Sequence, residues 1–143
     1  MTTKELIKQV SENFIKLEEK SEIIDKIAEI WIEALKNGNK IIFCGNGGSA
    51  ADSQHLSAEL MGRYKIDRNP MPALSLTTDT SALTAIGNDY GYDKVFSRPL
   101  RGIGRKGDVL VGISTSGNSK NILDAYKVAK EIGIKTVAFT GAK

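Results

Sequence analysis

The N-terminal part of the chain carries two stripes of apolar side chains at helical spacing. The stripes consist of Leu6, Val10, Phe14 and Leu17, and of Ile24, Ile27, Trp31 and Leu35. Such spacing places side chains on one face of an α-helix. We therefore predict a pair of helices over residues 1–38, with Ser21 as an N-cap and Gly38 as the C-terminal stop. The stripes can pack on their own domain or on a neighbouring subunit, and the sequence favours neither.

The pattern changes after residue 38, where short continuous apolar runs alternate with glycine-rich turns and helical segments. The predicted strands cover residues 40–44, 73–76, 109–113 and 135–140. The predicted helices cover residues 50–61, 81–86, 93–103 (kinked or broken by Pro99) and 120–132. Continuous apolar strands joined by helices are typical of a parallel sheet that is covered on both faces. The predicted fold class is α/β, a three-layer αβα sandwich with a mainly parallel sheet of the flavodoxin-like or Rossmann-like type.

The length of 143 residues suits a single domain. Within residues 1–143 we predict one domain, in which the helices of residues 1–38 precede an α/β part of residues 39–143. The chain stops at Thr140-Gly141-Ala142-Lys143, where a strand should lead into its crossover helix. We therefore expect that the natural protein continues and that the C-terminal part of the domain is missing from this chain.

Charge and composition exclude several classes of partner. The formal net charge is +3, from 20 Lys and Arg against 17 Asp and Glu, and the basic residues are scattered. No apolar run approaches the ~20 residues of a membrane helix, so we expect neither a nucleic-acid nor a membrane partner. Cys44 is the only cysteine, and it fits a buried core thiol better than a nucleophile. A chain without an internal disulfide suits a reducing compartment, so we expect a cytoplasmic protein.

A turn rich in hydroxyl groups follows the third predicted strand. Before a predicted helix it reads Gly112-Ile113-Ser114-Thr115-Ser116-Gly117-Asn118-Ser119. In parallel sheets ligands bind at the carboxyl ends of strands, and the N–H groups at a helix N-terminus favour an anion. Four hydroxyl groups can each donate to a phosphate oxygen, those of Ser114, Thr115, Ser116 and Ser119. An N-cap needs only one hydroxyl, so this serine loop (residues 114–119) predicts a phosphate site. Because the loop lacks Lys, the site is not a nucleotide P-loop.

The first predicted strand leads into a glycine-rich turn, here called the glycine loop (residues 45–49). With the next residue it reads Gly45-Asn46-Gly47-Gly48-Ser49-Ala50, which matches the G-x-G-x-x-A pattern of dinucleotide sites. No acidic residue follows at the end of a strand about 20 positions further on, as such sites require. A tight turn and close backbone approach to a sugar remain as interpretations. The serine loop in the same sheet favours ligand binding.

The helix after the glycine loop carries His55 and Glu59, which are four residues apart and share one face. This spacing also suits two ligands of one metal ion. A carboxylate on a helix that begins at a ligand loop can act as a general base beside a carbonyl group. Further polar residues near the predicted strand ends are Thr77, Thr78, Asp79, Asn88 and Asp89. The last two lie in a predicted turn over residues 87–91, where such residues are common for conformational reasons alone.

Three long motifs occur in order: CGNGGSAADSQHLSAELMGRY, LTTDTSALTAIGNDYGYDKVFSR and GDVLVGISTSGNSKNI. Over essentially the whole chain they resemble the phosphoheptose isomerases of the sugar isomerase (SIS) domain group. The resemblance implies a ketose–aldose isomerase that converts D-sedoheptulose 7-phosphate into D-glycero-D-manno-heptose 7-phosphate through an enediol. This reaction is the first step in the synthesis of ADP- or GDP-heptose precursors, which serve lipopolysaccharide or capsule.

The same resemblance implies roles for individual residues. Those expected to hold the phosphate are Ser114, Thr115, Ser116 and Ser119, with help from Ser49. Those expected to line the sugar site are Asn46, Gly47, Gly48, Asn88 and Asp89. Asp52 is expected beside the reacting end and Glu59 as the catalytic base, and His55 with Glu59 as half of a zinc site.

The resemblance further implies a homotetramer with sites at the subunit interfaces and one zinc ion per subunit. The N-terminal helices would then serve assembly. The family continues past this chain with a segment that carries two more metal ligands, a Gln and a His, and this His is also the acid/base partner of Glu59. Because the chain lacks both, we expect negligible turnover from these 143 residues alone.

Two other functions remain as alternatives. Some similar SIS proteins bind a replication initiator and are not enzymes, but they lack the carboxylate at the position of Glu59 and carry a bulkier residue in the serine loop. This chain has Glu59 and Ser116, which favours the enzyme. A phosphosugar-binding regulator or transferase subunit is the second alternative, because the fold alone does not fix the function.

Overall fold

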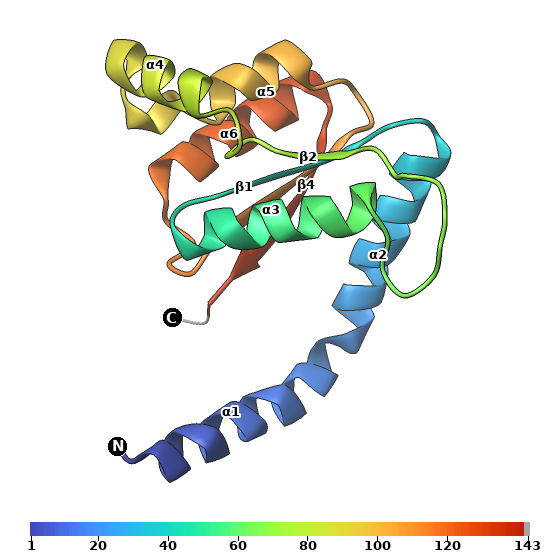
Figure 1. The fold of residues 1–143 in the computed structure, drawn as a ribbon, viewed down its shortest axis with the longest axis vertical. Coiled ribbons are helices and arrows are strands. Elements are labelled where there is room, and N and C mark those ends of the chain that lie inside the picture. The colour runs from blue at the N-terminus through green and yellow to red at the C-terminus, as the bar shows by residue number, and fades with distance from the viewer. Residues whose placement is uncertain (142–143) are drawn as a thin grey trace.

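The computed structural model describes residues 1–141 and has an α/β fold (Figure 1). Four parallel strands form one sheet in the order β2-β1-β3-β4. The strands are β1 (Ile41–Gly45), β2 (Ala73–Ser75), β3 (Val109–Ser114) and β4 (Lys135–Thr140). The α-helices are α1 (Thr3–Leu17), α2 (Ser21–Lys36), α3 (Gly48–Met61), α4 (Thr80–Tyr90), α5 (Ser97–Ile103) and α6 (Lys120–Ile132). The short 3₁₀ helices are η1 (Glu18–Lys20) and η2 (Tyr92–Lys94).

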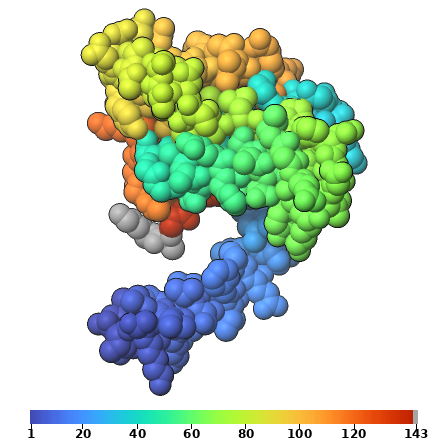
Figure 2. Space-filling view, viewed as in Figure 1, coloured from blue at the N-terminus to red at the C-terminus, as the bar shows by residue number. Residues whose placement is uncertain are grey.

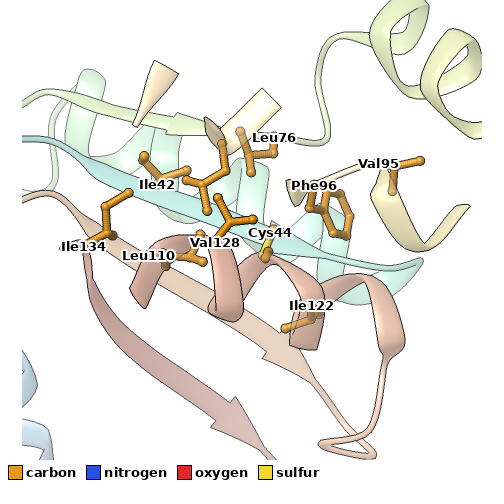
Figure 3. Packing of buried hydrophobic residues seen from close by; sticks show 12 residues of the cluster. Ile42, Cys44, Leu76, Val95, Phe96, Leu110, Ile122, Val128 and Ile134 are labelled. Carbon is orange, nitrogen blue, oxygen red and sulfur yellow. The ribbon is translucent and has the colours of Figure 1, made fainter. Parts of the chain in front are cut away.

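Alternate residues of the central strands face opposite layers of helices. On β1, Ile42 and Cys44 point into a core shared with α4, α5 and α6, and Figure 3 shows both among the other side chains of this core. Phe43 points to the other face, into a core shared with α2 and α3. All five residues of β1 are buried, as a strand with helices on both faces requires. The predicted three-layer αβα sandwich with a parallel sheet is confirmed.

The buried thiol that the sequence favoured is present at Cys44. Its side chain is 0% exposed, and burial raises the pKa of the thiol to about 12. A group of this kind is protonated at neutral pH and is not a nucleophile. The interpretation of Cys44 as part of the core is therefore confirmed.

Three local predictions are wrong in instructive ways. Ser21 is the first residue of α2 and caps nothing, because η1 carries the backbone from α1 into α2 without an extended N-cap residue. The predicted turn over residues 87–91 is helical up to Tyr90, since α4 continues until Gly91. The helix predicted over residues 93–103 is broken as expected, into η2 and α5, but at residues 95–96 and not at Pro99, which lies in the first turn of α5, where a backbone N–H has no partner in the helix.

The helix α1 stands apart from the body of the molecule (Figure 1 and Figure 2). Thr2 and Glu5 form a capping box at its start. None of its residues is buried, although its apolar stripe is long; Phe14 is 70% exposed. The other large exposed apolar side chains of α1 are Leu6, Ile7, Val10, Ile15 and Leu17. The stripe therefore packs on nothing in the described part of this chain.

A buried carboxylate joins the amino ends of two central strands. Asp108, which precedes β3, is 1% exposed. Its Oδ2 accepts from Lys40 Nζ at 2.6 Å and from the Arg105 N–H at 2.8 Å. Its Oδ1 accepts from the Lys40 N–H at 3.1 Å and from Asn39 Nδ2 at 3.3 Å. These bonds fix β1 against β3 at the end of the sheet opposite to the ligand loops.

Candidate functional site

The two loops predicted to bind ligand leave neighbouring strands at the same edge of the sheet. Strands β1 and β3 pair in parallel, and Gly45 lies opposite Ile113 in the register. The glycine loop after β1 and the serine loop after β3 therefore emerge side by side at the carboxyl ends. In a parallel sheet this is where ligands bind.

The hydroxyl groups of the serine loop converge. Ser114 Oγ lies 2.9 Å from Ser119 Oγ and 3.4 Å from Ser116 Oγ. Gly117 has a φ of 65° and its N–H donates to the Ser114 carbonyl at 3.0 Å, so the chain doubles back within the loop. The Thr115 hydroxyl is not part of this cluster, because Thr115 is exposed. The structure thus brings together three of the four predicted hydroxyls.

The N-terminus of α6 is open to an anion. Ser119 is its N-cap residue, yet no side chain caps the helix, because the Ser119 hydroxyl pairs with Ser114 instead. The backbone N–H groups of Lys120 and Asn121 have no acceptor among residues 1–141. Unpaired N–H groups and the positive end of the helix dipole favour a negatively charged ligand here. The cluster and the helix end together form a site of the right chemistry for phosphate.

The glycine loop offers backbone donors and open space. Gly47 has a φ of 58°, which few residues other than glycine adopt, and no side chain caps α3 after it. Within the described residues, the N–H groups of Gly47 and Gly48 have no acceptor, and a Cβ at either position would meet no atom within 4 Å. A Cβ at Gly45 would lie 2.6 Å from the Ser49 carbonyl carbon, so Gly45 serves the tight turn itself. The tight-turn interpretation therefore holds for Gly45, and the approach of a sugar to Gly47 and Gly48 stays a prediction.

Asn121 and Tyr92, which the sequence analysis did not single out, both bond to Asn46 of the glycine loop. Asn46 Nδ2 donates to Asn121 Oδ1 at 3.0 Å, and Asn121 Nδ2 donates back to Asn46 Oδ1 at 2.8 Å. The Tyr92 hydroxyl donates to the same Asn46 oxygen at 3.4 Å. Asn121 is 3% exposed and lies in the first turn of α6. Asn46 and Asn121 lie 75 residues apart in the sequence, so no periodic pattern could predict their contact.

His55 and Glu59 share a face of α3, as their spacing predicts, with 3.7 Å between Nε2 and Oε1. The Glu59 side chain is 35% exposed and that of His55 is 73% exposed. Asp52 lies on the same helix and is also exposed. Glu59 is in the last turn of α3, and a rise of ~1.5 Å per residue puts it roughly 16 Å along the axis from Gly48. The structure therefore does not bring Glu59 to the serine loop within one chain.

The end of α3 at Glu59 is held by Arg68. One guanidinium nitrogen donates to the Glu59 carbonyl at 2.8 Å, and the other donates to the Leu60 carbonyl at 2.9 Å. These carbonyls belong to the last turn, where a helix has no internal donors for them. Arg68 thus fixes the segment that presents Glu59, and no pattern in the sequence indicates this contact.

The remaining predicted polar residues lie after β2 and at the two ends of α4. Asn88 and Asp89 are exposed in the last turn of α4, where Asn88 Nδ2 donates to Asp89 Oδ1 at 2.8 Å. Thr77 is buried and accepts from Gln54 Nε2 at 3.0 Å, which ties the end of β2 to α3. Asp79 caps α4 through the Ala82 N–H at 2.9 Å. Thr77 and Asp79 therefore have structural contacts of their own, and facing the ligand remains a prediction for them.

Known proteins resemble this chain over nearly all of its length. A family model described as "SIS domain" matches residues 5–141. A protein named phosphoheptose isomerase from Akkermansia muciniphila is 61% identical over 132 residues, which are 92% of this chain and 70% of that protein. Another of the same name from Aliarcobacter butzleri is 60% identical over 87% of this chain and 66% of its own length.

The chain belongs to the phosphoheptose isomerase family of SIS-domain proteins.

Solved structures of the family have the same fold. The phosphoheptose isomerase from Neisseria gonorrhoeae superposes with a TM-score of 0.82 at 48% identity, covering 99% of this chain and 77% of that one. The Francisella tularensis enzyme gives 0.87 at 34% identity, covering 100% and 78%. The resemblance inferred from the three sequence motifs is confirmed. The chain spans between 66% and 70% of the two curated relatives above, so the activity of a whole phosphoheptose isomerase is a matter for proposal.

His55 and Glu59 can supply half of the ligands of the zinc site that the sequence motifs imply. Two ligands of tetrahedral zinc at ~2.0–2.1 Å lie roughly 3.4 Å apart, and the 3.7 Å between His55 and Glu59 is close to this. Residues 1–141 contain no group of three or more His, Cys, Asp or Glu side chains that could hold a metal ion. The pair therefore fits zinc as two ligands and needs others from elsewhere.

Proposed function

We propose that the protein carrying this chain isomerises D-sedoheptulose 7-phosphate to D-glycero-D-manno-heptose 7-phosphate. The observation that carries the proposal is the convergence of three serine hydroxyls on the uncapped N-terminus of α6. Membership of the phosphoheptose isomerase family supports the choice of sugar. The product would feed heptose precursors for lipopolysaccharide or capsule, and we propose the cytoplasm as the compartment.

In this proposal the serine loop anchors the phosphate. Ser114, Ser116 and Ser119 donate through their hydroxyls, and the first N–H groups of α6 add backbone donors to the phosphate oxygens. Within the described residues the N–H groups of Gly47 and Gly48 have no acceptor, and a Cβ at either glycine would meet no atom within 4 Å, so these N–H groups are proposed to bind the sugar oxygens. The phosphate thereby fixes the position of the distant reacting carbons, which lowers the entropic cost of the chemical step.

The chemistry is a proton transfer between C1 and C2. Glu59 accepts a proton from C1 of the ketose, and an enediolate forms as C2=O becomes C2–O⁻. The proton is returned to C2, and the proton of the O1 hydroxyl passes to the oxygen at C2, which yields the aldose carbonyl at C1 and a hydroxyl at C2. Asp52, one helical turn before His55, is proposed to bind hydroxyls at the reacting end. Zinc held by His55 and Glu59 would supply electrophilic stabilisation of the oxygens at C1 and C2.

The position of Glu59 favours a site completed by a second subunit. Glu59 lies about 16 Å along α3 from the glycine loop, which exceeds the length of a heptose phosphate anchored on the serine loop of the same chain. The exposed apolar stripe of α1, with Phe14 at 70% exposure, gives a surface through which subunits can associate. We therefore propose a homotetramer whose sites combine residues from neighbouring chains.

The decisive experiment is an isomerase assay on the natural gene product that contains this chain. Wild type should convert sedoheptulose 7-phosphate, and Glu59→Gln should lower kcat by about 10²–10⁴, as expected for loss of a general base. Conversion by Glu59→Gln at the wild-type rate would remove Glu59 from the mechanism. A stronger response to an aminohexose phosphate than to the heptulose phosphate would favour a regulator or transferase subunit instead.

A mixing experiment tests the shared site. Glu59→Gln protein and Ser116→Leu protein, each nearly inactive alone, are unfolded, mixed and refolded together. If the serine loop and Glu59 of one site come from different subunits, mixed oligomers contain some intact sites and regain up to about a quarter of the wild-type activity, the statistical share of intact pairings. No recovery in mixed oligomers of confirmed composition would place both groups of each site in one chain.

A further inference from the structure

Asn121 occupies a position that the proposed reaction does not account for. The residue is 3% exposed, although its helix starts at the ligand loops. Its side-chain amide both donates a hydrogen bond to Asn46 and accepts one from it. A buried amide in the first turn of a helix usually caps or bonds the local backbone. Here it reaches instead to a side chain on another loop, which makes it the direct side-chain link between the serine-loop helix and the glycine loop.

The pair restricts what Asn46 can offer to a ligand. The Asn46 oxygen already accepts from Asn121 at 2.8 Å and from the Tyr92 hydroxyl at 3.4 Å. One of its two amide hydrogens is donated to Asn121 at 3.0 Å. An amide oxygen has two lone pairs, so both acceptor positions are taken and a single N–H remains. Asn46 is thereby set to donate to a sugar oxygen and not to accept from a sugar hydroxyl.

The same contacts fix the separation of the two loops. The backbone register of β1 and β3 sets the loops side by side only up to Gly45 and Ile113, where the pairing of these two strands ends. Beyond that point, the side-chain hydrogen bonds that join them among residues 1–141 are those of the Asn46–Asn121 pair, because the serine cluster bonds within its own loop. A ligand that touches both loops therefore depends on this pair, whereas an anion bound by the serine loop alone does not.

We propose that Asn121 is a positioning residue that clamps the glycine loop to the serine loop and orients the Asn46 amide toward the sugar. The inference rests on the proposed function only for the identity of the sugar. Asn121 itself touches neither the phosphate nor the reacting carbons through its side chain. Its effect reaches the ligand through Asn46. Asn121 therefore strengthens the binding of a sugar phosphate, which touches both loops, and does not affect the binding of a bare phosphate.

The test compares two probes on the natural gene product. Asn121→Ala should weaken binding of sedoheptulose 7-phosphate by about tenfold in calorimetry, the size of one to two hydrogen bonds. The stabilisation of the same variant by inorganic phosphate in thermal unfolding should match that of wild type. Asn121→Asp keeps the size and replaces the donor with an oxygen that faces the Asn46 oxygen, so it should show the same split if the alanine variant does not fold. Asn37→Ala, an exposed asparagine at the end of α2, is the matched control.

A double substitution distinguishes clamping from a general loss of stability. If Asn121 acts through Asn46, the double variant Asn46→Ala/Asn121→Ala should bind the sugar phosphate no more weakly than Asn46→Ala alone. Independent, multiplying losses would overturn the proposal, and so would an equal loss of affinity for inorganic phosphate.

Hydrogen exchange of the glycine loop supplies a readout without any ligand. In Asn121→Ala the amides of residues 46–50 should exchange faster, while those of β1 and β3 keep wild-type rates. Unchanged exchange in the loop would overturn the clamp. Failure of the wild type to bind the heptulose phosphate would overturn the proposed function, and the exchange comparison would still decide the clamp.

Discussion

Replacing Asp108 with Asn should destabilise the fold strongly, although the change alters few atoms. The amide oxygen of Asn can still accept from Asn39 and from the Lys40 N–H. The NH₂ group would then face Lys40 Nζ and the Arg105 N–H, which now donate to Oδ2 at 2.6 and 2.8 Å. Two hydrogen bonds to a charged group, each worth about 1.5–3 kcal/mol, are lost. Because the Lys40 side chain is 23% exposed and can regain water, we expect the low end, about 3 kcal/mol.

Urea unfolding followed by the fluorescence of Trp31 measures this change. Trp31 is the only tryptophan, and its ring lies edge-on to Phe43 in the core with centroids 5.6 Å apart. With an m-value of about 2 kcal/mol/M, the loss corresponds to a midpoint shift of about 1.5 M. All variants must be compared at one protein concentration, because association of subunits also contributes to stability.

The matched control is Asp124→Asn, the same chemical change in a more exposed ion pair. Asp124 accepts from Lys94 Nζ at 2.9 and 3.0 Å, and its side chain is 21% exposed while that of Lys94 is 46% exposed. Ion pairs in contact with solvent contribute about 0–1 kcal/mol. A loss below about 1 kcal/mol for Asp108→Asn, or equal losses in the two variants, would refute the reasoning from burial.

The stability gap between wild type and Asp108→Asn should also depend on pH. Burial raises the pKa of Asp108, but the bonds from Lys40, Arg105 and Asn39 outweigh this, so the pKa lies below its ordinary value. A carboxylate with a lowered native pKa contributes its stability fully above the unfolded pKa of about 3.9 and loses it as the pH falls through the native value. The gap should therefore be constant near neutral pH and shrink in acid. A gap that widens in acid would contradict the assignment.

Two further predictions concern the sheet and the zinc ligands. In Gly112→Ala a Cβ would overlap the Tyr126 hydroxyl and lie 2.7 Å from Ile122 Cγ2, so thermal unfolding should show that the free energy of unfolding falls by about 1–3 kcal/mol. Adding Tyr126→Phe should recover part of this loss. An unchanged stability of Gly112→Ala would mean that α6 shifts freely on β3. In the natural gene product, His55→Ala should lower the zinc content measured by elemental analysis by at least tenfold, since loss of one ligand removes much of the affinity, and full occupancy in the variant would exclude His55 as a ligand.

Much of the architecture was predictable because it depends on local patterns. The continuous apolar runs of β1 and β3 predicted buried parallel strands, and helix α6 and strand β4 begin and end at the predicted residues. Gly133 ends α6 with a φ of 85°, as a left-handed C-cap requires. Where the prediction was wrong, packing outweighed local preference. The segment before Gly91 has turn-forming residues, yet α4 continues through it because Leu83 and Ile86 pack against the core.

The sequence by itself determined the kinds of groups at the site. Four hydroxyls with a glycine between a strand and a helix predict an anion site, since each feature acts within a few residues of the next. Only the tertiary structure decided how these groups are arranged. It turned Thr115 out of the cluster, placed Glu59 at the far end of α3, and paired Asn46 with an asparagine 75 residues away. Such pairings depend on strand order and register, which emerge from the packing of the whole sheet and leave no periodic trace along the chain.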